Sequence, residues 1–145
     1  MRELKEYFGK NPIPVIPTGL KQAVDTTNIM FHADGSIFYM YGIQLTKNIN
    51  DIKSPSILIQ INKGAMPLKD CFYKGNVKKE STIGTTKLII GALKMGEDYS
   101  EQGVPASYYD VYYSQFMYEG IGYNISAERV SVDAFMELLE GIITK

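Results

Sequence analysis

The stretch that decides the fold is DVYYSQFMYEGIGYNISAERVSVDAFMELLEGII, residues 110–143. Its first half holds two runs rich in aromatic and aliphatic residues, DVYYSQFMY and IGYNISAE, on either side of Glu119-Gly120, and two turn residues between such runs predict a tight β-hairpin. Pairing across this turn divides the side chains into a mostly apolar face, expected in the core, and a more polar face, expected in solvent. The apolar set is Tyr112, Phe116, Tyr118, Ile121, Tyr123 and Ile125; the polar set is Tyr113, Gln115, Asn124 and Ser126.

The second half of the same stretch predicts an amphipathic helix. Ser131 is a favourable N-cap, and Asp133 places a negative charge in the first turn, where it suits the helix dipole. Apolar side chains then recur with the spacing of one helix face. They are Val132, Phe135, Met136, Leu139, Ile142 and Ile143, with Leu138 on the flank. We expect this face to pack against the apolar side of a sheet.

A second hairpin is predicted upstream, where Asp34-Gly35 joins NIMFHA (28–33) to SIFYMYGIQ (36–44). This dipeptide tolerates the positive φ of a tight turn. A two-residue turn would pair Phe31 with Phe38 on one face. The other face would carry Met30, His32, Ile37, Tyr39 and Tyr41. Since both faces are apolar, this hairpin is either covered on both sides or presents an aromatic patch to a partner.

Three further strands are expected between the hairpins: SILIQIN (56–62), VKKEST (77–82) and TKLIIGAL (86–93). Successive strands joined by short connections favour antiparallel pairing of sequence neighbours. The predicted fold class is therefore α+β, an antiparallel meander sheet of about six to eight strands with a C-terminal helix packed on one face.

The chain has 145 residues, which suits one domain. Residues 1–19 are expected to form an N-terminal lead-in, a short helix followed by the proline-rich segment NPIPVIPTG (11–19), because proline excludes helix there. Residues 20–145 would form the single α+β domain. The sequence shows neither a signal peptide nor an apolar run long enough to span a membrane.

Composition argues against several functions. The net charge of −1 and pI near 5.8 lack the basic excess typical of nucleic-acid binders. With one histidine, His32, and one cysteine, Cys71, the chain has no His/Cys metal motif. Phosphate-binding and calcium-binding loop patterns are missing as well. We therefore predict no catalytic residues, cofactor or metal; a His32–Cys71 dyad is the alternative, although a single strand histidine is more often a packed side chain.

Tyrosine is the unusual feature of the composition: eleven tyrosines and no tryptophan. Tyrosine suits binding surfaces, because a rigid apolar ring carries a polar tip, but it also has a high strand propensity. The residues we predict as a candidate interaction surface are Met30, His32, Ile37, Tyr39, Tyr41, Tyr109 and Tyr113.

Several motifs together resemble a known family. The motifs that carry the resemblance follow the order expected for that family. They are PIPVIPTGLK, FHADGSIFYMYGIQ, SILIQINKG, STIGTTKLIIG and the terminal hairpin and helix. The chain resembles a bacterial domain family of unknown function that forms the C-terminal, extracytoplasmic region of membrane-anchored, anti-sigma-factor-like proteins. It is more distantly similar to the C-terminal domain of RseB-type periplasmic regulators. The resemblance implies no catalytic residues.

This resemblance implies a non-catalytic extracytoplasmic binding or sensing module of a membrane-associated, regulatory bacterial protein. We expect a protein partner, no nucleic acid, and membrane contact only through an anchor outside this chain. The residues leave two alternatives. A carrier of a small apolar ligand would need a cavity lined by residues such as Phe116, Tyr123 and Phe135, and a small hydrolase would need converging polar side chains.

Overall fold

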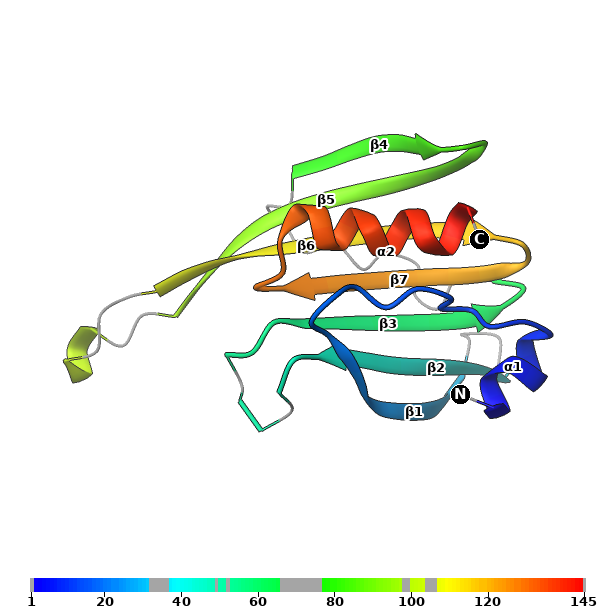
Figure 1. Ribbon diagram of the computed structural model, residues 1–145, viewed down its shortest axis with the longest axis horizontal. Coiled ribbons are helices and arrows are strands. Elements are labelled where there is room, and N and C mark those ends of the chain that lie inside the picture. Colours follow the sequence, from blue (N-terminus) through cyan, green and yellow to red (C-terminus); the bar gives the residue numbers. More distant parts are fainter. Residues whose placement is uncertain are drawn as a thin grey trace.

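Two helices and seven strands make up the described part of the chain (Figure 1). The computed structural model describes residues 2–31, 37–48, 50–51, 53–65, 77–97, 100–103 and 107–144. Helix α1 (Arg2–Phe8) comes first, and α2 (Val132–Thr144) comes last. The strands are β1 (Lys21–Phe31), β2 (Ile37–Thr46), β3 (Ser56–Lys63), β4 (Val77–Ile83), β5 (Thr86–Glu97), β6 (Ser107–Tyr118) and β7 (Ile121–Glu128), with a 3-10 turn at Ser100–Gln102.

The strands form one antiparallel sheet in the order β1-β2-β3-β7-β6-β5-β4. The predicted α+β class, antiparallel sheet and C-terminal helix are confirmed, but the single meander is only partly matched. Two meanders, β1–β3 and β4–β7, meet where β3 pairs with β7. The reason lies in composition: β3 and β7 are largely buried and take the centre, whereas the charged sequence VKKEST places β4 at an edge.

The turn of the β6–β7 hairpin is as predicted. Glu119 and Gly120 have φ of 50° and 78°, as a type I′ turn requires of both central residues. Tyr118 pairs with Ile121, and the polar face differs from expectation because Tyr113 and Asn124 are buried. In the equivalent β4–β5 turn, Gly84 has a φ of 59°, the positive value that a type II′ turn requires at its first central position.

The register of β1 and β2 differs from the predicted one. Phe31 pairs with Ile37, and Met30 pairs with Phe38, so the expected Phe31–Phe38 pair is wrong. The strands end at Phe31 and Ile37, which leaves residues 32–36 as the connection, longer than the two-residue turn assumed. Because a shift of one residue exchanges the two faces of a strand, Met30 does not belong with Ile37 and its neighbours.

Helix α2 lies across one face of the sheet (Figure 1). The Ser131 hydroxyl accepts a hydrogen bond from the Ala134 amide at 3.1 Å, which confirms the predicted N-cap. The buried side chains of the helix are Phe135, Leu138, Leu139, Ile142 and Ile143. Val132 was expected in this stripe but is 50% exposed.

Ring stacking fills the space beneath α2. Phe116 and Tyr123 stack across the β6–β7 pair with centroids 4.8 Å apart, and Tyr112 stacks on Phe135 of the helix at 5.7 Å. Such offset pairs contribute beyond their buried area. One stacked pair, Tyr112 with Phe135, thus joins α2 to the sheet alongside the aliphatic side chains of the core.

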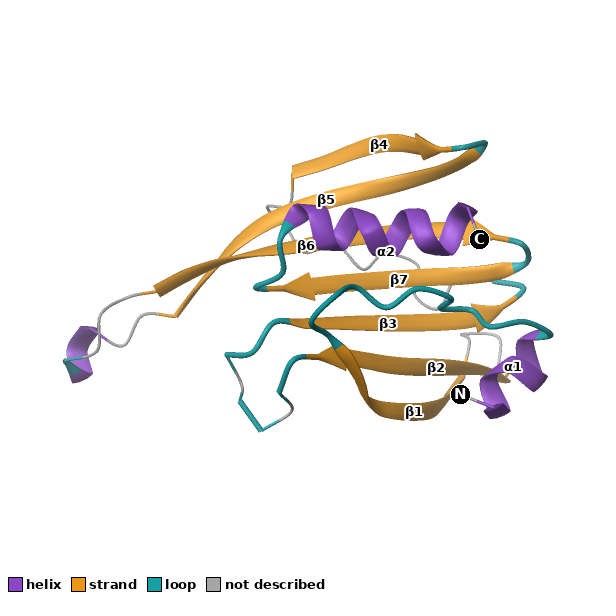
Figure 2. Ribbon diagram, in the orientation of Figure 1, coloured by secondary structure: helices purple, strands orange, loops and turns teal. Residues whose placement is uncertain are grey.

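The proline-rich segment expected as a lead-in packs on the same face. It runs beside α2 over β7 and β3 (Figure 2), and Pro12 and Ile13 are buried. The hydroxyl of Tyr123 donates to the Pro12 carbonyl oxygen at 2.8 Å. On α2, a Cβ at position 141 would lie 2.7 Å from the Val15 Cβ, so Gly141 allows the close approach. We call residues 8–17 the strap; it contributes to the core.

Ser114 provides a small test of this core. It is fully buried on β6, and its Oγ has no hydrogen-bond partner among the described residues. An unsatisfied buried hydroxyl is destabilising, so Ser114→Ala is expected to raise the free energy of unfolding by about 1 kcal/mol. Urea denaturation would check this. A fall of similar size would mean that the hydroxyl does have a partner.

Candidate functional site

The sheet face turned away from α2 carries the candidate site, which is built by β4, β5 and β6. In the register, Glu80 lies opposite Ile89, and Ile89 lies opposite Gln115. Residues opposed in this way share a face of the sheet. The alternation of strands adds one more residue from each strand to the same face. These are Thr82, Lys87 and Met117.

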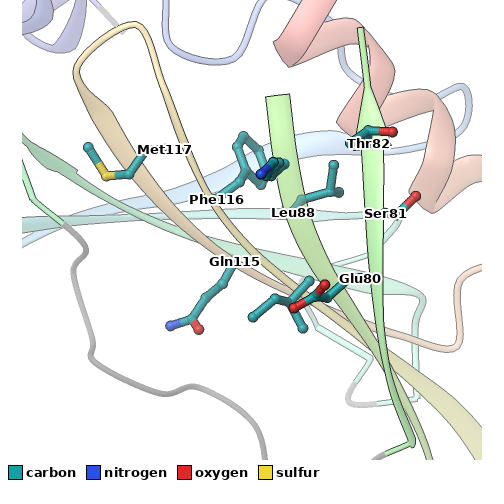
Figure 3. Close-up of a pocket in the computed structure, with 9 residues that line it drawn as sticks. Glu80, Ser81, Thr82, Leu88, Gln115, Phe116 and Met117 are labelled. Atoms are coloured by element: carbon teal, nitrogen blue, oxygen red, sulfur yellow. The ribbon is translucent and has the colours of Figure 1, made fainter. Parts of the chain in front are cut away.

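A groove of about 620 Å³ lies over these residues, and we call it the sheet groove. Three further residues complete the lining, and each is the neighbour in its strand of a residue named above: Ser81, Leu88 and Phe116. Leu88 and Phe116 belong to the core, on the face of α2. Figure 3 shows Glu80, Gln115 and Met117 extending to one side of the strands and Ser81 and Leu88 to the other.

The groove combines an apolar floor with a polar rim. Ile89 is 36% exposed and Met117 is 40% exposed, although both lie inside regular strands. Glu80 and Lys87 supply one charge of each sign, and Gln115 supplies an amide. A contiguous exposed apolar patch with a polar rim is a common feature of sites that bind another molecule. The groove can therefore bury an apolar side chain and hydrogen-bond the chain that carries it.

The perturbed ionisable groups belong to the contacts of the strap. Lys10 forms an ion pair with Glu119, and this hydrogen-bonded charge lowers the pKa of the Glu119 carboxyl. Burial raises the pKa of the Tyr123 hydroxyl, the one that binds Pro12. These shifts have a structural cause, the packing of the strap on β6 and β7. Within the described ranges, no group of three His, Cys, Asp or Glu side chains could hold a metal.

The tyrosines of the predicted interaction surface lie in different places. Tyr41 is half-buried on β2, with its ring 5.1 Å from that of Tyr7 and 5.6 Å from that of Phe8. On β6, the Tyr109 ring packs beneath the Arg129 guanidinium at 3.8 Å. Tyr113 is only 6% exposed. Tyr41 packs with the core beneath α1, whereas alternation places Tyr113 on the face of the groove.

The remaining predicted residues are placed by strand alone. Met30 belongs to β1, and Ile37 and Tyr39 belong to β2. His32 and Cys71 lie outside the described residues, so the alternative of a dyad is left untested. Sequence reasoning missed Ile89 and Met117. The sequence did contain one sign of Ile89. Leu88 lies on the apolar face of β5, so its neighbour Ile89 lies on the opposite face.

Comparison with known proteins adds no assignment. No family model matches this chain, and no curated protein or solved structure is significantly similar to it. In the part of the chain that the structure describes, neither helix has the length and apolar character that crossing a membrane demands.

Proposed function

We propose that this protein is a non-catalytic binding module that captures an extended segment of a partner protein in the sheet groove. The observation that carries the proposal is the pair Ile89 and Met117, two exposed apolar side chains in a groove of about 620 Å³. The resemblance described above adds that the module is extracytoplasmic, belongs to a membrane-associated bacterial protein and has a regulatory, sensing role.

The energetics of the groove agree with this role. Full burial of an isoleucine or methionine side chain contributes about 1.5–3 kcal/mol. Two such anchors can offset part of the entropic cost of association, and hydrogen bonds from the rim would add to them. Burial of Ile89 and Met117 therefore supports a reversible complex with a short segment.

The alternative of a small apolar ligand carried between sheet and helix has less support. Its cavity would be lined by Phe116, Tyr123 and Phe135, each at most 3% exposed. Stacking occupies the space beside these rings, with Phe116 on Tyr123 and Phe135 on Tyr112. The sheet groove is on the other face and is open.

A selection from displayed random peptides of about ten residues, the length of a strand, tests the proposal. We expect the full chain to enrich extended peptides that carry an apolar residue. Ile89→Lys with Met117→Lys should weaken binding of an enriched peptide at least about tenfold, because a lysine charge would have to be desolvated on the apolar floor. Fluorescence anisotropy of the labelled peptide gives the dissociation constants.

The control is Val132→Lys, which adds one lysine charge on α2, at an apolar residue that is 50% exposed. It should leave the affinity unchanged. Failure to enrich any peptide, or equal loss of affinity in the control, would contradict the proposal. Thermal unfolding of each variant separates lost binding from lost folding.

A further inference from the structure

The two edges of the sheet differ in regularity. At the β1 edge, the pairing with β2 shifts between Gln22 and Val24, which marks a bulge or irregularity. At the β4 edge, every residue from Val77 to Ile83 pairs with β5 in continuous register, and β4 has no proline. Proteins commonly protect edge strands with bulges, prolines or charges. Of these devices, β4 has charge alone.

The turn between β4 and β5 determines which amides of β4 face outward. Ile83 pairs with Thr86 across a two-residue connection, and residues that close such a turn exchange hydrogen bonds. Inward and outward peptide groups then alternate along the strand. The N–H and C=O groups of Thr82 and Glu80 therefore point away from β5, along the outer edge.

The same two residues line the sheet groove through their side chains. A strand added at this edge would bond to the backbone of Glu80 and Thr82 and place alternate side chains beside the groove. The regular outer edge of β4 and the sheet groove thus form one continuous surface. We infer that the partner segment binds by strand addition, antiparallel to β4, with its backbone on the outer edge and an apolar side chain directed towards the groove.

Charge indicates which segment fits. Lys78 and Glu80 lie two positions apart on one face of β4 and are both exposed. Cross-strand pairs of opposite charge are favourable, so the segment should carry a basic residue opposite Glu80 and an acidic one opposite Lys78. Thr82 is short, which leaves room opposite it for a large apolar residue reaching over the sheet. In chain order, the segment reads apolar, any, basic, any, acidic.

This inference rests on the proposed function, and its test uses a synthetic peptide of that pattern, such as Ac-TLTKTETS-amide. Glu80→Pro removes the outward N–H of the edge, and proline is tolerated at such a position. The matched control Glu80→Ala removes the same carboxylate but keeps the N–H. We expect at least about tenfold weaker binding for Glu80→Pro than for Glu80→Ala. Peptide methylated at the backbone nitrogen of its lysine should also bind weakly.

The outcomes separate the two proposals. Binding that is lost in the Ile89→Lys, Met117→Lys variant but equal in Glu80→Pro and Glu80→Ala would overturn strand addition and leave the groove as the site. Loss of affinity in neither variant, or no binding of any peptide, would overturn both. A second copy of the chain is the competing occupant. If light scattering showed a dimer in the absence of peptide, and Glu80→Pro abolished that dimer, the occupant of the edge would be β4 of a second copy.

Discussion

A chain without residues 1–19 is expected to lose cooperative folding. Phe8, Pro12 and Ile13 are buried in the intact protein, and burying such a side chain contributes about 1.5–3 kcal/mol. Their loss would cost roughly 5–9 kcal/mol as an upper estimate, comparable to the whole stability of a domain. It would also leave the hydroxyl of Tyr123 without Pro12. Circular dichroism during urea denaturation would show a broad transition or none.

A shorter deletion is the control for this experiment. Removal of residues 1–6 spares the strap and takes away only side chains that are exposed where they are described, Lys5 and Glu6. It should keep a cooperative transition at a slightly lower urea concentration. If the chain lacking residues 1–19 unfolded as cooperatively as the control, the strap would be an appendage of a domain complete from residue 20.

Phe135→Ala is expected to lower the free energy of unfolding by about 3–5 kcal/mol. The side chain is fully buried, and its ring stacks on Tyr112 with an interplanar angle of 19°. Truncation would open a cavity between α2 and β6 and remove this stacking. Chemical denaturation of both proteins measures the difference.

Val132→Ala on the same helix is the matched control, because Val132 is half exposed. Its stability should change by less than about 0.5 kcal/mol. A loss below about 1 kcal/mol for Phe135→Ala would mean that α2 is not the second layer of the core.

Local chemistry made much of this fold predictable. Glu119-Gly120 accepts positive φ at both turn positions, so the β6–β7 register followed from the turn alone. Ser131 and the apolar spacing after it located α2 because a helix is determined by residues close in sequence. By contrast, the pairing of Phe31 depended on the length of residues 32–36, which the Asp34-Gly35 motif does not determine.

Contacts between residues that are distant in sequence could not be predicted from sequence patterns. The pairing of β3 with β7 joins residues as distant as Ile59 and Ile125, and alternation within each strand is the same for any order of strands. The packing of the strap depends on distant residues as well. Prolines predict extended backbone, but the burial of Pro12 depends on Tyr123, far along the chain.

The candidate site was missed because it exists only in three dimensions. Ile89 and Met117 lie on different strands, and each is an ordinary strand residue in sequence. Their significance comes from a sheet that is covered by α2 and the strap on one face, while these two remain exposed on the other. The predicted interaction surface stays a prediction. In the structure, Tyr41 and Tyr113 lie on opposite faces of the sheet.

Nitrogen–proton NMR correlation spectra of the full chain, recorded during titration with an enriched peptide, test the central proposal most directly. The proposed binding site predicts shifts confined to β4, β5 and β6, largest at Glu80, Thr82, Ile89 and Met117. Shifts centred on α2 or the strap, or no shift at a peptide concentration above the dissociation constant, would contradict it.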